Sequence, residues 1–356
     1  MSKFGTEMKR IFVSDVHMGA GKSFQAGYTG HVYDWLSPDE ALAFADFLIY
    51  LNNNPQIEEI ILLGDIMDNW VCPVDINPPT FEEIVAAEIN NEVVTNLKTL
   101  SENKKTLYIP GNHDMSVTED FLQANFKNIV IQNEYNQEDI FASHGSEYSI
   151  FCAADPVNDV TGRLPIGYYI SRVAATNAAR TGSKNNLRDY IKALEKLVSE
   201  KPILGVLDAA VAEAHLADDT NIIMNNKDIS VKEVKERYVN LHSQWDESGN
   251  LLSANAATVD EINQLWTAVW ELNNQKGYKI IIFGHTHDSC LDKFPKNEIE
   301  ENIYIYANTG AWCMGNSFTF VETEKSDENG KHYVRLKTWD GEKRKPADNY
   351  QEESID

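Results

Sequence analysis

The sequence has few cysteines, few basic residues and no long apolar run, and each shortage excludes a class of protein. Four cysteines occur among 356 residues and none belongs to a C-x-x-C pair, so reduced structural thiols are favoured over a disulfide framework or a thiolate zinc site. No apolar stretch is long enough to span a bilayer, and the first ten residues contain no apolar signal-peptide core. We therefore expect a cytoplasmic protein without a transmembrane segment, and peripheral contact with a membrane stays open.

Basic residues are outnumbered by acidic ones, 31 against 55, which gives a formal net charge of −24. Such a surface repels a polyphosphate backbone, so no nucleic-acid partner is expected. A small phosphorylated substrate is still compatible with this charge, because bound cations can dominate the charge of a local site. The length permits one large domain with an insertion or two domains, and the oligomeric state does not follow from the sequence.

Polar clusters rich in His, Asp and Asn are what the sequence does contain, and each follows a short apolar run that predicts a buried strand. These clusters hold five of the nine histidines. In chain order they are Asp15-Val16-His17, Gly64-Asp65-Ile66-Met67-Asp68, Gly111-Asn112-His113-Asp114, His144-Gly145 and Gly284-His285-Thr286-His287.

The order of predicted elements indicates an α/β fold. Strands alternate with helices up to residue 146, including helices over 39–51 and 81–102, and each strand ends in a polar cluster, which is typical of a site at the strand ends. Helical periodicity dominates residues 147–276, which we interpret as a helical insertion or cap. A strand over 279–283 then resumes the sheet. The core is thus expected to comprise residues 1–146 and 277–340, followed by a charged mobile tail over 341–356.

The clustered side chains offer carboxylate, amide and imidazole donors without a thiolate. This set suits Mn²⁺, Fe²⁺/³⁺ or Zn²⁺ better than Ca²⁺ or a structural cysteine-zinc site. Seven or eight donors exceed what one ion needs, so two ions bridged by one carboxylate are the economical interpretation, and such a pair is suited to phosphoester chemistry. Taken singly, each residue has an ordinary alternative role, such as a core histidine, a turn asparagine or an aspartate cap.

In this order the five clusters resemble the calcineurin-like metallophosphoesterase superfamily, over about residues 11–145 and 279–338. The resemblance implies a four-layer α/β/β/α sandwich with two metal ions at the strand ends, foremost Mn²⁺, with Fe or Zn as alternatives. It further implies that a metal-bound hydroxide attacks a phosphoester or diphosphate bond of a small substrate. One ion would be held by Asp15, His17, Asp65 and His287, and the other by Asp65, Asn112, His144 and His285. His113 would be the catalytic histidine and Asp68 its hydrogen-bonding acid, whereas Asp114 is expected only to support its loop.

Two segments, Ser14–Gly19 and Gly64–Trp70, are most similar to the branch that includes the UDP-2,3-diacylglucosamine pyrophosphohydrolases. The chain departs from that branch in two ways: His113 stands where those enzymes commonly have Arg, and the helical insertion is longer. A UDP-sugar lipid and a nucleotide phosphodiester are therefore alternative substrates. A non-catalytic scaffold with this fold is less favoured, because the expected metal ligands and the catalytic histidine are all present.

Within the expected insertion, residues 160–192 carry six basic side chains and one acid. They could form a lid that offers guanidinium groups to a phosphate, or they could simply be solvated helix faces. The candidate substrate-binding residues are Arg163 and Arg172 from this window and Asn69 beside Asp68.

Overall fold

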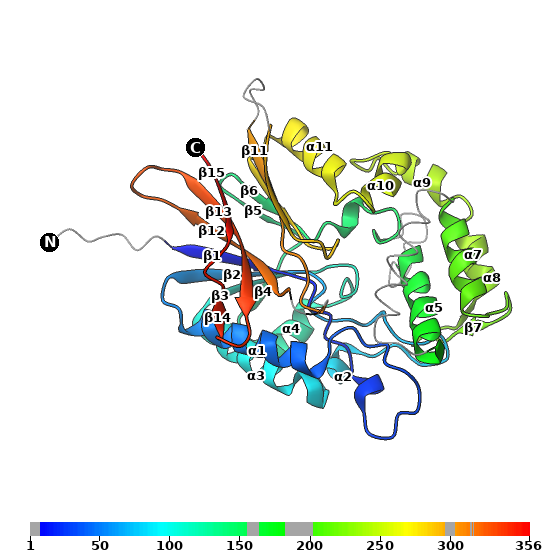
Figure 1. The fold of residues 1–356 in the computed structure, drawn as a ribbon. Helices are drawn as coiled ribbons and strands as arrows, with labels where there is room; N and C mark the ends of the chain where they lie inside the picture. The colour runs from blue at the N-terminus through cyan, green and yellow to red at the C-terminus, as the bar shows by residue number, and fades with distance from the viewer. Residues whose placement is uncertain (1–7, 155–163, 182–201, 296–302, 314, 316) are drawn as a thin grey trace.

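Two β-sheets pack face to face in the computed structural model, which describes residues 8–154, 164–181, 202–295, 303–313, 315 and 317–356 (Figure 1). In spatial order the larger sheet contains β14 (Lys345–Pro346), β13 (His332–Asp340), β12 (Thr319–Lys325), β1 (Lys9–Val13), β2 (Ile57–Leu63), β3 (Lys105–Ile109) and β4 (Ile129–Ile131), and β15 (Gln351–Ile355) also pairs with β13. The smaller sheet contains β10 (Cys290–Phe294), β11 (Tyr304–Asn308), β9 (Ile280–Phe283), β6 (Ile140–Ala142) and β5 (Tyr135–Gln137).

Helices cover the outer face of each sheet. The larger sheet is covered by α1 (Pro38–Asn53), α3 (Asn91–Asn103) and α4 (Glu119–Phe126), and α11 (Trp266–Lys276) lies on the smaller sheet (Figure 1). Side chains alternate along each strand, so Phe12 and Ile61 pack between the sheets, whereas Ile11 and Ile60 pack toward α1 and α3. The predicted four-layer α/β/β/α arrangement is therefore confirmed.

Local sequence explains the start of α1, whereas a long-range contact accompanies the break in another predicted helix. The helix predicted over 39–51 is present as α1, and it starts at a capping box formed by Ser37 and Glu40 with Pro38 at the first position. The single helix predicted over 81–102 is wrong. That segment divides into α2 (Phe81–Ala86), a 3-10 turn (Glu88–Asn90) and α3, because the Asn90 amide donates to the carbonyls of Ile84 and Gly19.

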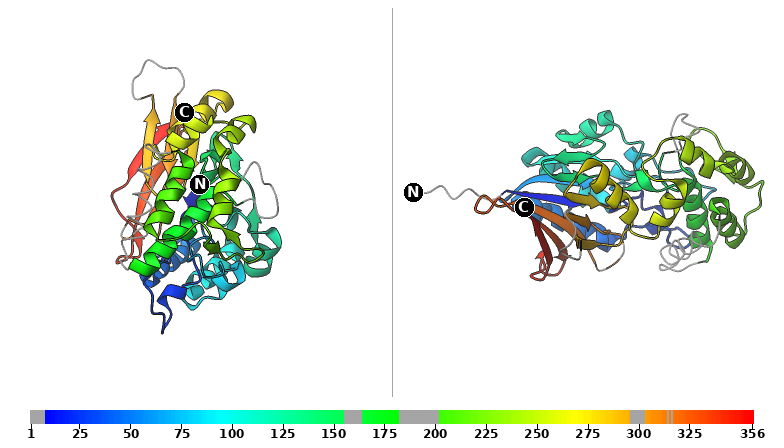
Figure 2. Two further views of the ribbon diagram at one scale, coloured as in Figure 1. Left: turned by 90° about the vertical axis from the view of Figure 1, so that its right-hand side faces the viewer. Right: turned by 90° about the horizontal axis from the view of Figure 1, so that it is seen from above.

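The stretch between β6 and β9 is mostly helical. It contains the 3-10 turn η3 (Ser146–Tyr148), α5 (Ile166–Thr181), α7 (Ile203–Glu213), β7 (Asn221–Ile222), β8 (Ile229–Ser230), α8 (Val231–Tyr238), α9 (Leu241–Glu247), α10 (Ala254–Asp260) and α11. Seen from two directions, α5, α7 and α8 lie at the end of the molecule opposite the start of β1, beyond the carboxyl ends of the strands (Figures 1 and 2). Among the described residues, none of the helices combines the length and apolar composition that a bilayer crossing requires.

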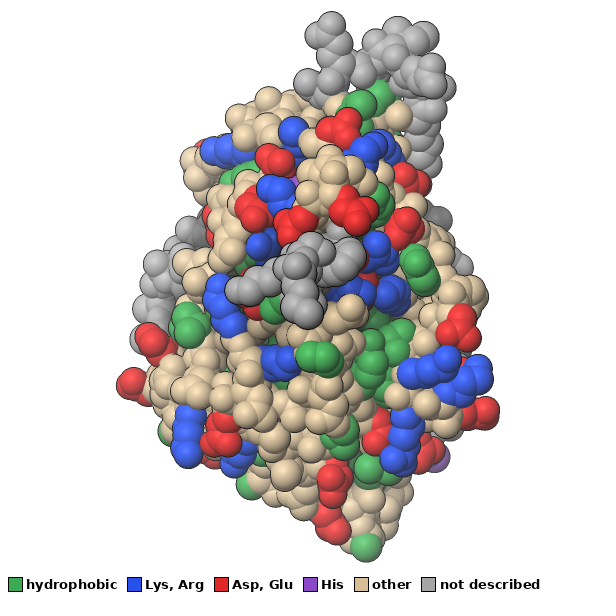
Figure 3. Space-filling model, turned by 90° about the vertical axis from the view of Figure 1, so that its left-hand side faces the viewer, with side chains coloured by type: hydrophobic (Ala, Val, Ile, Leu, Met, Phe, Trp, Pro, Cys, Tyr) green, Lys and Arg blue, Asp and Glu red, His purple; other side chains and the backbone are tan. Residues whose placement is uncertain are grey.

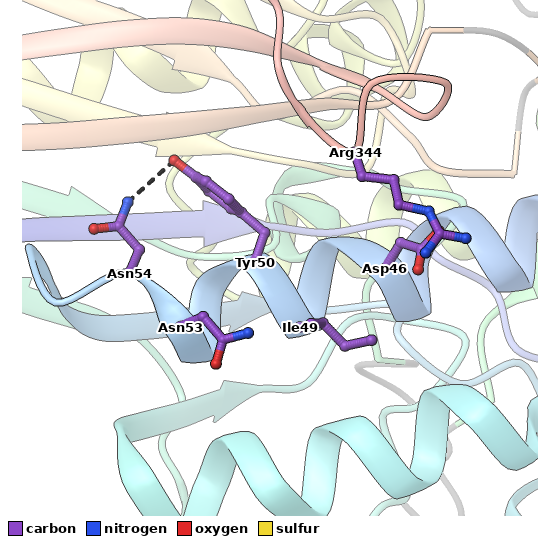
Figure 4. Close-up of a pocket in the computed structure, with 6 residues that line it drawn as sticks. All are labelled: Asp46, Ile49, Tyr50, Asn53, Asn54 and Arg344. Carbon is purple, nitrogen blue, oxygen red and sulfur yellow. Dashed lines mark hydrogen bonds and ion pairs between the residues drawn. The ribbon is translucent and has the colours of Figure 1, made fainter.

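The expected mobile tail over 341–356 is wrong. Residues Gln351–Ile355 form β15, which pairs antiparallel with β13 from Leu336 to His332 and buries Ile355. The open edge of β13 supplies unpaired backbone groups that the last residues satisfy, a contact that charge and proline content do not reveal. The preceding turn contacts α1, where Arg344 lies 3.1 Å from Asp46 at the rim of a shallow hollow (Figure 4).

Acidic and basic side chains are interspersed on the face at which β1 begins (Figure 3). Opposite charges also pair within the larger sheet, where Glu322 of β12 contacts Lys9 of β1 and Arg335 and Lys337 of β13. The negative excess of the chain is therefore not gathered on this face.

Candidate metal centre and active site

The ends of five parallel strands supply the residues of the candidate site. Strands β1, β2 and β3 are neighbours in the larger sheet, and β6 and β9 are neighbours in the smaller one. Because the sheets pack against each other, the loops after these strands meet at one edge. They bring together the predicted metal ligands and the predicted catalytic pair, namely Asp15, His17, Asp65, Asp68, Asn112, His113, His144, His285 and His287.

The backbone is left-handed at five of the predicted ligands. The φ angle lies between 53° and 66° at Asp15, His17, Asp65, His285 and His287. This region costs a non-glycine residue on the order of 1 kcal/mol or more and is retained mainly where function requires it. Backbone hydrogen bonds hold the conformation in place, since the amides of residues 16 and 17 both donate to the Asp65 carbonyl at 2.9 Å.

Close approach explains the glycines that precede these ligands. Gly64 has a φ of +84°, and a Cβ there would lie 2.5 Å from Nδ1 of His144. At Gly284 a Cβ would lie 2.6 Å from Oδ2 of Asp15. Any larger residue at either position would displace a predicted ligand.

The four predicted ligands of the first ion lie close to one another. Nε2 of His287 is 3.0 Å from Nε2 of His17 and 3.2 Å from Oδ1 of Asp15. Nε2 of His17 is in turn 3.8 Å from both Oδ1 of Asp15 and Oδ2 of Asp65. These four side chains form the first ligand group.

The second ligand group also contains Asp65. Its Oδ2 lies 3.1 Å from Nε2 of His144, and ligand atoms of Asp65, His144 and His285 lie within 4.8 Å of one another. Asn112 precedes His113, whose backbone amide donates to Oδ1 of Asp65 at 2.7 Å. With Oδ1 occupied in this way, Oδ2 of Asp65 faces both His17 and His144, so this carboxylate is common to the two groups.

The orientation of the donors fits metal ligation. Nδ1 of His17 lies 3.0 Å from Oδ2 of Asp68, and Nδ1 of His144 donates to the carbonyl of Leu63 at 2.8 Å. These outer partners turn Nε2 of both rings toward the centre. Oδ1 of Asn112 is buried and has no hydrogen-bond partner in the described part of the chain, which is the state expected of an oxygen that would hold a cation.

Charge is unevenly distributed among these groups. Burial opposes ionisation of Asp15 and Asp65, but the neighbouring His144 holds the pKa of both carboxyls below its ordinary value. Despite burial, contacts with Asp15 and Asp68 raise the pKa of His17 to about 10, and Asp65 and Asp15 raise that of His144 to about 10. Burial together with the nearby His144 lowers the pKa of His285 to about 3. A metal that binds His17 and His144 therefore displaces protons.

His113 lies beside both ligand groups and is fixed from two sides. Its Nδ1 is 3.0 Å from Oδ1 of Asp68. Its ring stacks on Trp70, with centroids 4.5 Å apart and an interplanar angle of 29°. Asp68 is itself held by the backbone amides of Trp70 and Val71, at 2.9 and 3.0 Å. The side chain with the predicted catalytic role is thus rigidly oriented at the edge of the centre.

A family model described as calcineurin-like phosphoesterase matches residues 8–289, well over half of the chain. The chain belongs to the calcineurin-like phosphoesterase family. Membership identifies metal-dependent phosphoester hydrolysis as the general chemistry of the fold, and the clustered histidines and aspartates fit divalent metal ions. No curated protein matches the chain.

The solved structures to which the chain is similar share little sequence with it. GAP50, the anchor in the inner membrane complex of Plasmodium, is 11% identical, with 98% of this chain and 89% of that chain covered and a TM-score of 0.40. An archaeal phosphodiesterase is 12% identical, with 98% and 100% covered and a TM-score of 0.28. The Pseudomonas putida nuclease MPE is 20% identical, with 38% of this chain covered and a TM-score of 0.25, and the alignment spans 53% of the nuclease.

Asp114 supports the loops beside the candidate site. Its Oδ2 accepts from the amides of Ile66 and Met67 and from the Tyr108 hydroxyl, and its Oδ1 accepts from the Gly111 amide. Burial, followed by repulsion from Asp65, raises the pKa of Asp114 to about 6. These four bonds join the loops after β2 and β3, the supporting role expected from the sequence.

Arg172, a predicted substrate-binding residue, is hydrogen-bonded within the protein in this structure. It is fully buried, and its guanidinium donates to the Tyr168 hydroxyl and to four backbone carbonyls, those of Cys72, Pro73, Ile76 and Ile223. The charge pattern of the window suggested a lid, but this arginine lies on the buried face of α5 and joins it to the loop after β2.

Of the other two candidate substrate-binding residues, the structure describes only Asn69. Asn69 is half-buried beside His113, with its backbone amide donating to the His113 carbonyl at 3.3 Å and its side-chain amide 3.4 Å from the Ser116 hydroxyl. Its role stays a prediction. Arg163 lies outside the described residues.

Several side chains near the centre were not found from the sequence. The Trp35 ring lies 5.4 Å from the His17 ring and 5.5 Å from the His287 ring. Cys313 lies beside these two histidines, and Glu261 and Cys152 lie beside His285. No local signal could have identified them, because each is distant in sequence from the ligand it approaches and none belongs to a repeated spacing.

Proposed function

We propose that the chain is a dinuclear metal-dependent phosphohydrolase that cleaves a phosphoester or diphosphate bond of a small substrate. The observation that supports this proposal is the position of Asp65, whose Oδ2 lies 3.8 Å from Nε2 of His17 and 3.1 Å from Nε2 of His144. One carboxylate common to two groups of ligands is the arrangement that a two-metal site needs.

The two ions would be held by the ligand groups defined above. One group comprises Asp15, His17, Asp65 and His287, and the other comprises Asp65, Asn112, His144 and His285. When bound, the ions supply Lewis acidity toward a phosphoryl group and acidify water near neutral pH. The oxygen and imidazole donors favour Mn²⁺, with Fe or Zn as alternatives.

The chain itself contributes orientation and proton transfer. The stack on Trp70 and the contact with Asp68 hold the His113 imidazole in one orientation. We assign to this ring the donation of a proton to the leaving oxygen. The net charge of −24 disfavours long polyanions, which limits the substrate to a small phosphoester or diphosphate.

The decisive experiment combines metal content with hydrolysis. Full-length protein reconstituted with Mn²⁺ should contain two ions per chain and should hydrolyse an aryl phosphate monoester or diester. Asp65→Ala should lose both metal and activity, whereas His113→Ala should keep the metal and lose activity by a factor on the order of 10²–10⁴. Asp348→Ala and His242→Ala are matched controls, because both side chains lie on the surface away from the centre.

Two outcomes would contradict the proposal. Full activity in both Asp65→Ala and His113→Ala would place the chemistry elsewhere. Fewer than one transition-metal ion per reconstituted chain, with no hydrolysis, would instead favour a non-catalytic member of the family. A panel of nucleotide diesters, sugar nucleotides and lipid-linked diphosphates then identifies the substrate class.

A further inference from the structure

Cys313 brings a thiol to the first ligand group, although no thiolate was expected at this centre. Its sulfur and one ring nitrogen each of His17 and His287 lie within 4.8 Å of one another. Cys313 is fully buried. This spacing is compatible with donors that share one metal ion, since ligands about 2.0–2.3 Å from an ion lie some 3–4 Å apart.

The backbone fixes Cys313 beside Asp15. The loop that follows β11 carries this cysteine, and the amide of Trp312 donates to the Asp15 carbonyl at 2.9 Å. Earlier in the same loop, the Thr309 hydroxyl bonds the Ser14 hydroxyl, which in turn donates to the Asp15 carboxylate. The thiol is therefore tied to the same segment that supplies two ligands of the first ion.

We infer that the Cys313 thiolate is an additional ligand of the ion held by Asp15, His17, Asp65 and His287. The inference rests on the proposed two-metal function and goes beyond it. As the metal binds, the S–H bond breaks, a metal–sulfur bond forms and the proton passes to solvent, so the charge of the donor set becomes more negative by one.

A thiolate makes the two ions chemically different. Sulfur is a soft donor that favours Zn²⁺ or Fe²⁺ over Mn²⁺, whereas the second group offers only oxygen and imidazole among its predicted ligands. The first position should therefore select Zn²⁺ or Fe²⁺ and the second should accept Mn²⁺. Zn²⁺ should bind the first position at least about tenfold more tightly in wild type than in Cys313→Ser.

Two of the other three described cysteines provide controls. Cys72 is buried and belongs to neither ligand group, and its thiol lies 3.9 Å from the Ile76 carbonyl. Cys152 lies beside the second group, where its thiol is 3.9 Å from Oε1 of Glu261. Cys72→Ser thus tests a buried thiol without a metal, and Cys152→Ser tests a thiol at the other ion.

Cobalt substitution tests the inference directly. Full-length protein loaded with two Co²⁺ ions should show a sulfur-to-cobalt charge-transfer band in the near ultraviolet. The band should persist in Cys72→Ser and Cys152→Ser. It should disappear in Cys313→Ser, whose visible cobalt bands should remain. X-ray absorption of the zinc-loaded wild type provides a measurement that needs no variant, with a Zn–S distance of about 2.3 Å expected.

The outcomes separate this inference from the proposed function. Two bound cobalt ions without a charge-transfer band, or a band lost in Cys152→Ser and kept in Cys313→Ser, would overturn thiolate ligation by Cys313 and leave the two-metal centre intact. Failure to bind cobalt at all would overturn both. If Cys313→Ser does not fold, absence of a Zn–S shell in the wild type would still refute the inference.

Discussion

Oδ2 of Asp68 lies 3.0 Å from Nδ1 of His17, in a buried hydrogen bond that links the predicted catalytic acid to a predicted metal ligand. The other oxygen of the same carboxylate lies 3.0 Å from Nδ1 of His113. Asp68 therefore contacts both imidazoles through different oxygens, whereas the family resemblance implied only the contact with His113.

Asp68→Asn should affect metal binding as well as turnover. The asparagine keeps the shape of the side chain but removes the charge that orients His17. We expect metal affinity to fall about 10–100-fold, along with a decrease in kcat. Calorimetric titration with Mn²⁺ measures the first effect, and Asp348→Asn is the surface control. Unchanged affinity with reduced kcat would show that Asp68 serves His113 alone.

The sequence predicted those parts of the molecule that depend on local pattern. Each buried strand is a short apolar run, and each ligand cluster follows its strand within a few residues, so both could be identified without knowing how the sheets pack. The capping box of Ser37 and Glu40 likewise marked the start of α1. The two ligand groups then followed from the family pattern, because parallel strands deliver their carboxyl ends to one edge.

The wrong predictions concern segments whose structure depends on contacts with residues distant in the sequence. Asn90 ends the predicted long helix by bonding to Gly19, and the last residues form a strand because β13 has an open edge. Arg172 has the charge of a phosphate ligand, but carbonyls from two other segments, the loop after β2 and the residue after β7, accept its hydrogen bonds. Cys313 approaches His17 only because the loop after β11 returns to β1. None of these contacts leaves a periodicity or a spacing in the sequence.

Arg172→Met should destabilise the fold rather than weaken substrate binding. The substitution leaves four carbonyls without their donor, two of them in buried and two in partly buried hydrogen bonds, and we expect a loss of about 3–5 kcal/mol in the free energy of unfolding. Arg180→Met, which removes one bond to the Ala214 carbonyl, should cost about 1 kcal/mol. Urea denaturation measures both. A raised KM at unchanged stability would restore the substrate-binding interpretation of Arg172.

Glu322→Gln should make the protein less stable in a pH-dependent way. Its carboxylate lies 2.9 Å from Lys337, 3.1 Å from Arg335 and 3.2 Å from Lys9. Burial opposes ionisation, but Lys337 and then Lys9 hold the pKa of Glu322 below its ordinary value. A lowered pKa stabilises the fold above the unfolded value of about 4.3, and this contribution is lost as the pH falls through the folded pKa.

We therefore expect Glu322→Gln to lose about 1–3 kcal/mol at pH 7 and to approach the stability of the wild type in acid. Urea denaturation between pH 7 and pH 3 measures the difference. Glu352→Gln removes a more exposed partner of Arg335 and should cost less than about 1 kcal/mol. A loss of equal size at every pH would indicate that packing, not charge, explains the effect.

His285 and His287 should serve different ions although they are two residues apart. In an extended strand both side chains would point the same way, but both residues are left-handed, with φ angles of 66° and 61°. Their neighbours differ accordingly. Nε2 of His287 lies 3.0 Å from His17, whereas His285 groups with Asp65 and His144. Each histidine should therefore control the occupancy of one position.

His287→Ala should lower the affinity for the first ion, and His285→Ala the affinity for the second, each by about 100-fold or more. Loss of the hydrogen-bond partner of a ligand lowers metal affinity about 10–100-fold, and loss of the ligand itself should have a larger effect. Elemental analysis at limiting Mn²⁺ should then find about one ion per chain in either variant, against two in the wild type and in the surface variant His242→Ala. Cobalt identifies which position is lost, because its sulfur charge-transfer band should change in His287→Ala and persist in His285→Ala. Equal loss of both ions in each variant would mean that the histidines act as one unit, and the division of the centre at Asp65 would then be wrong.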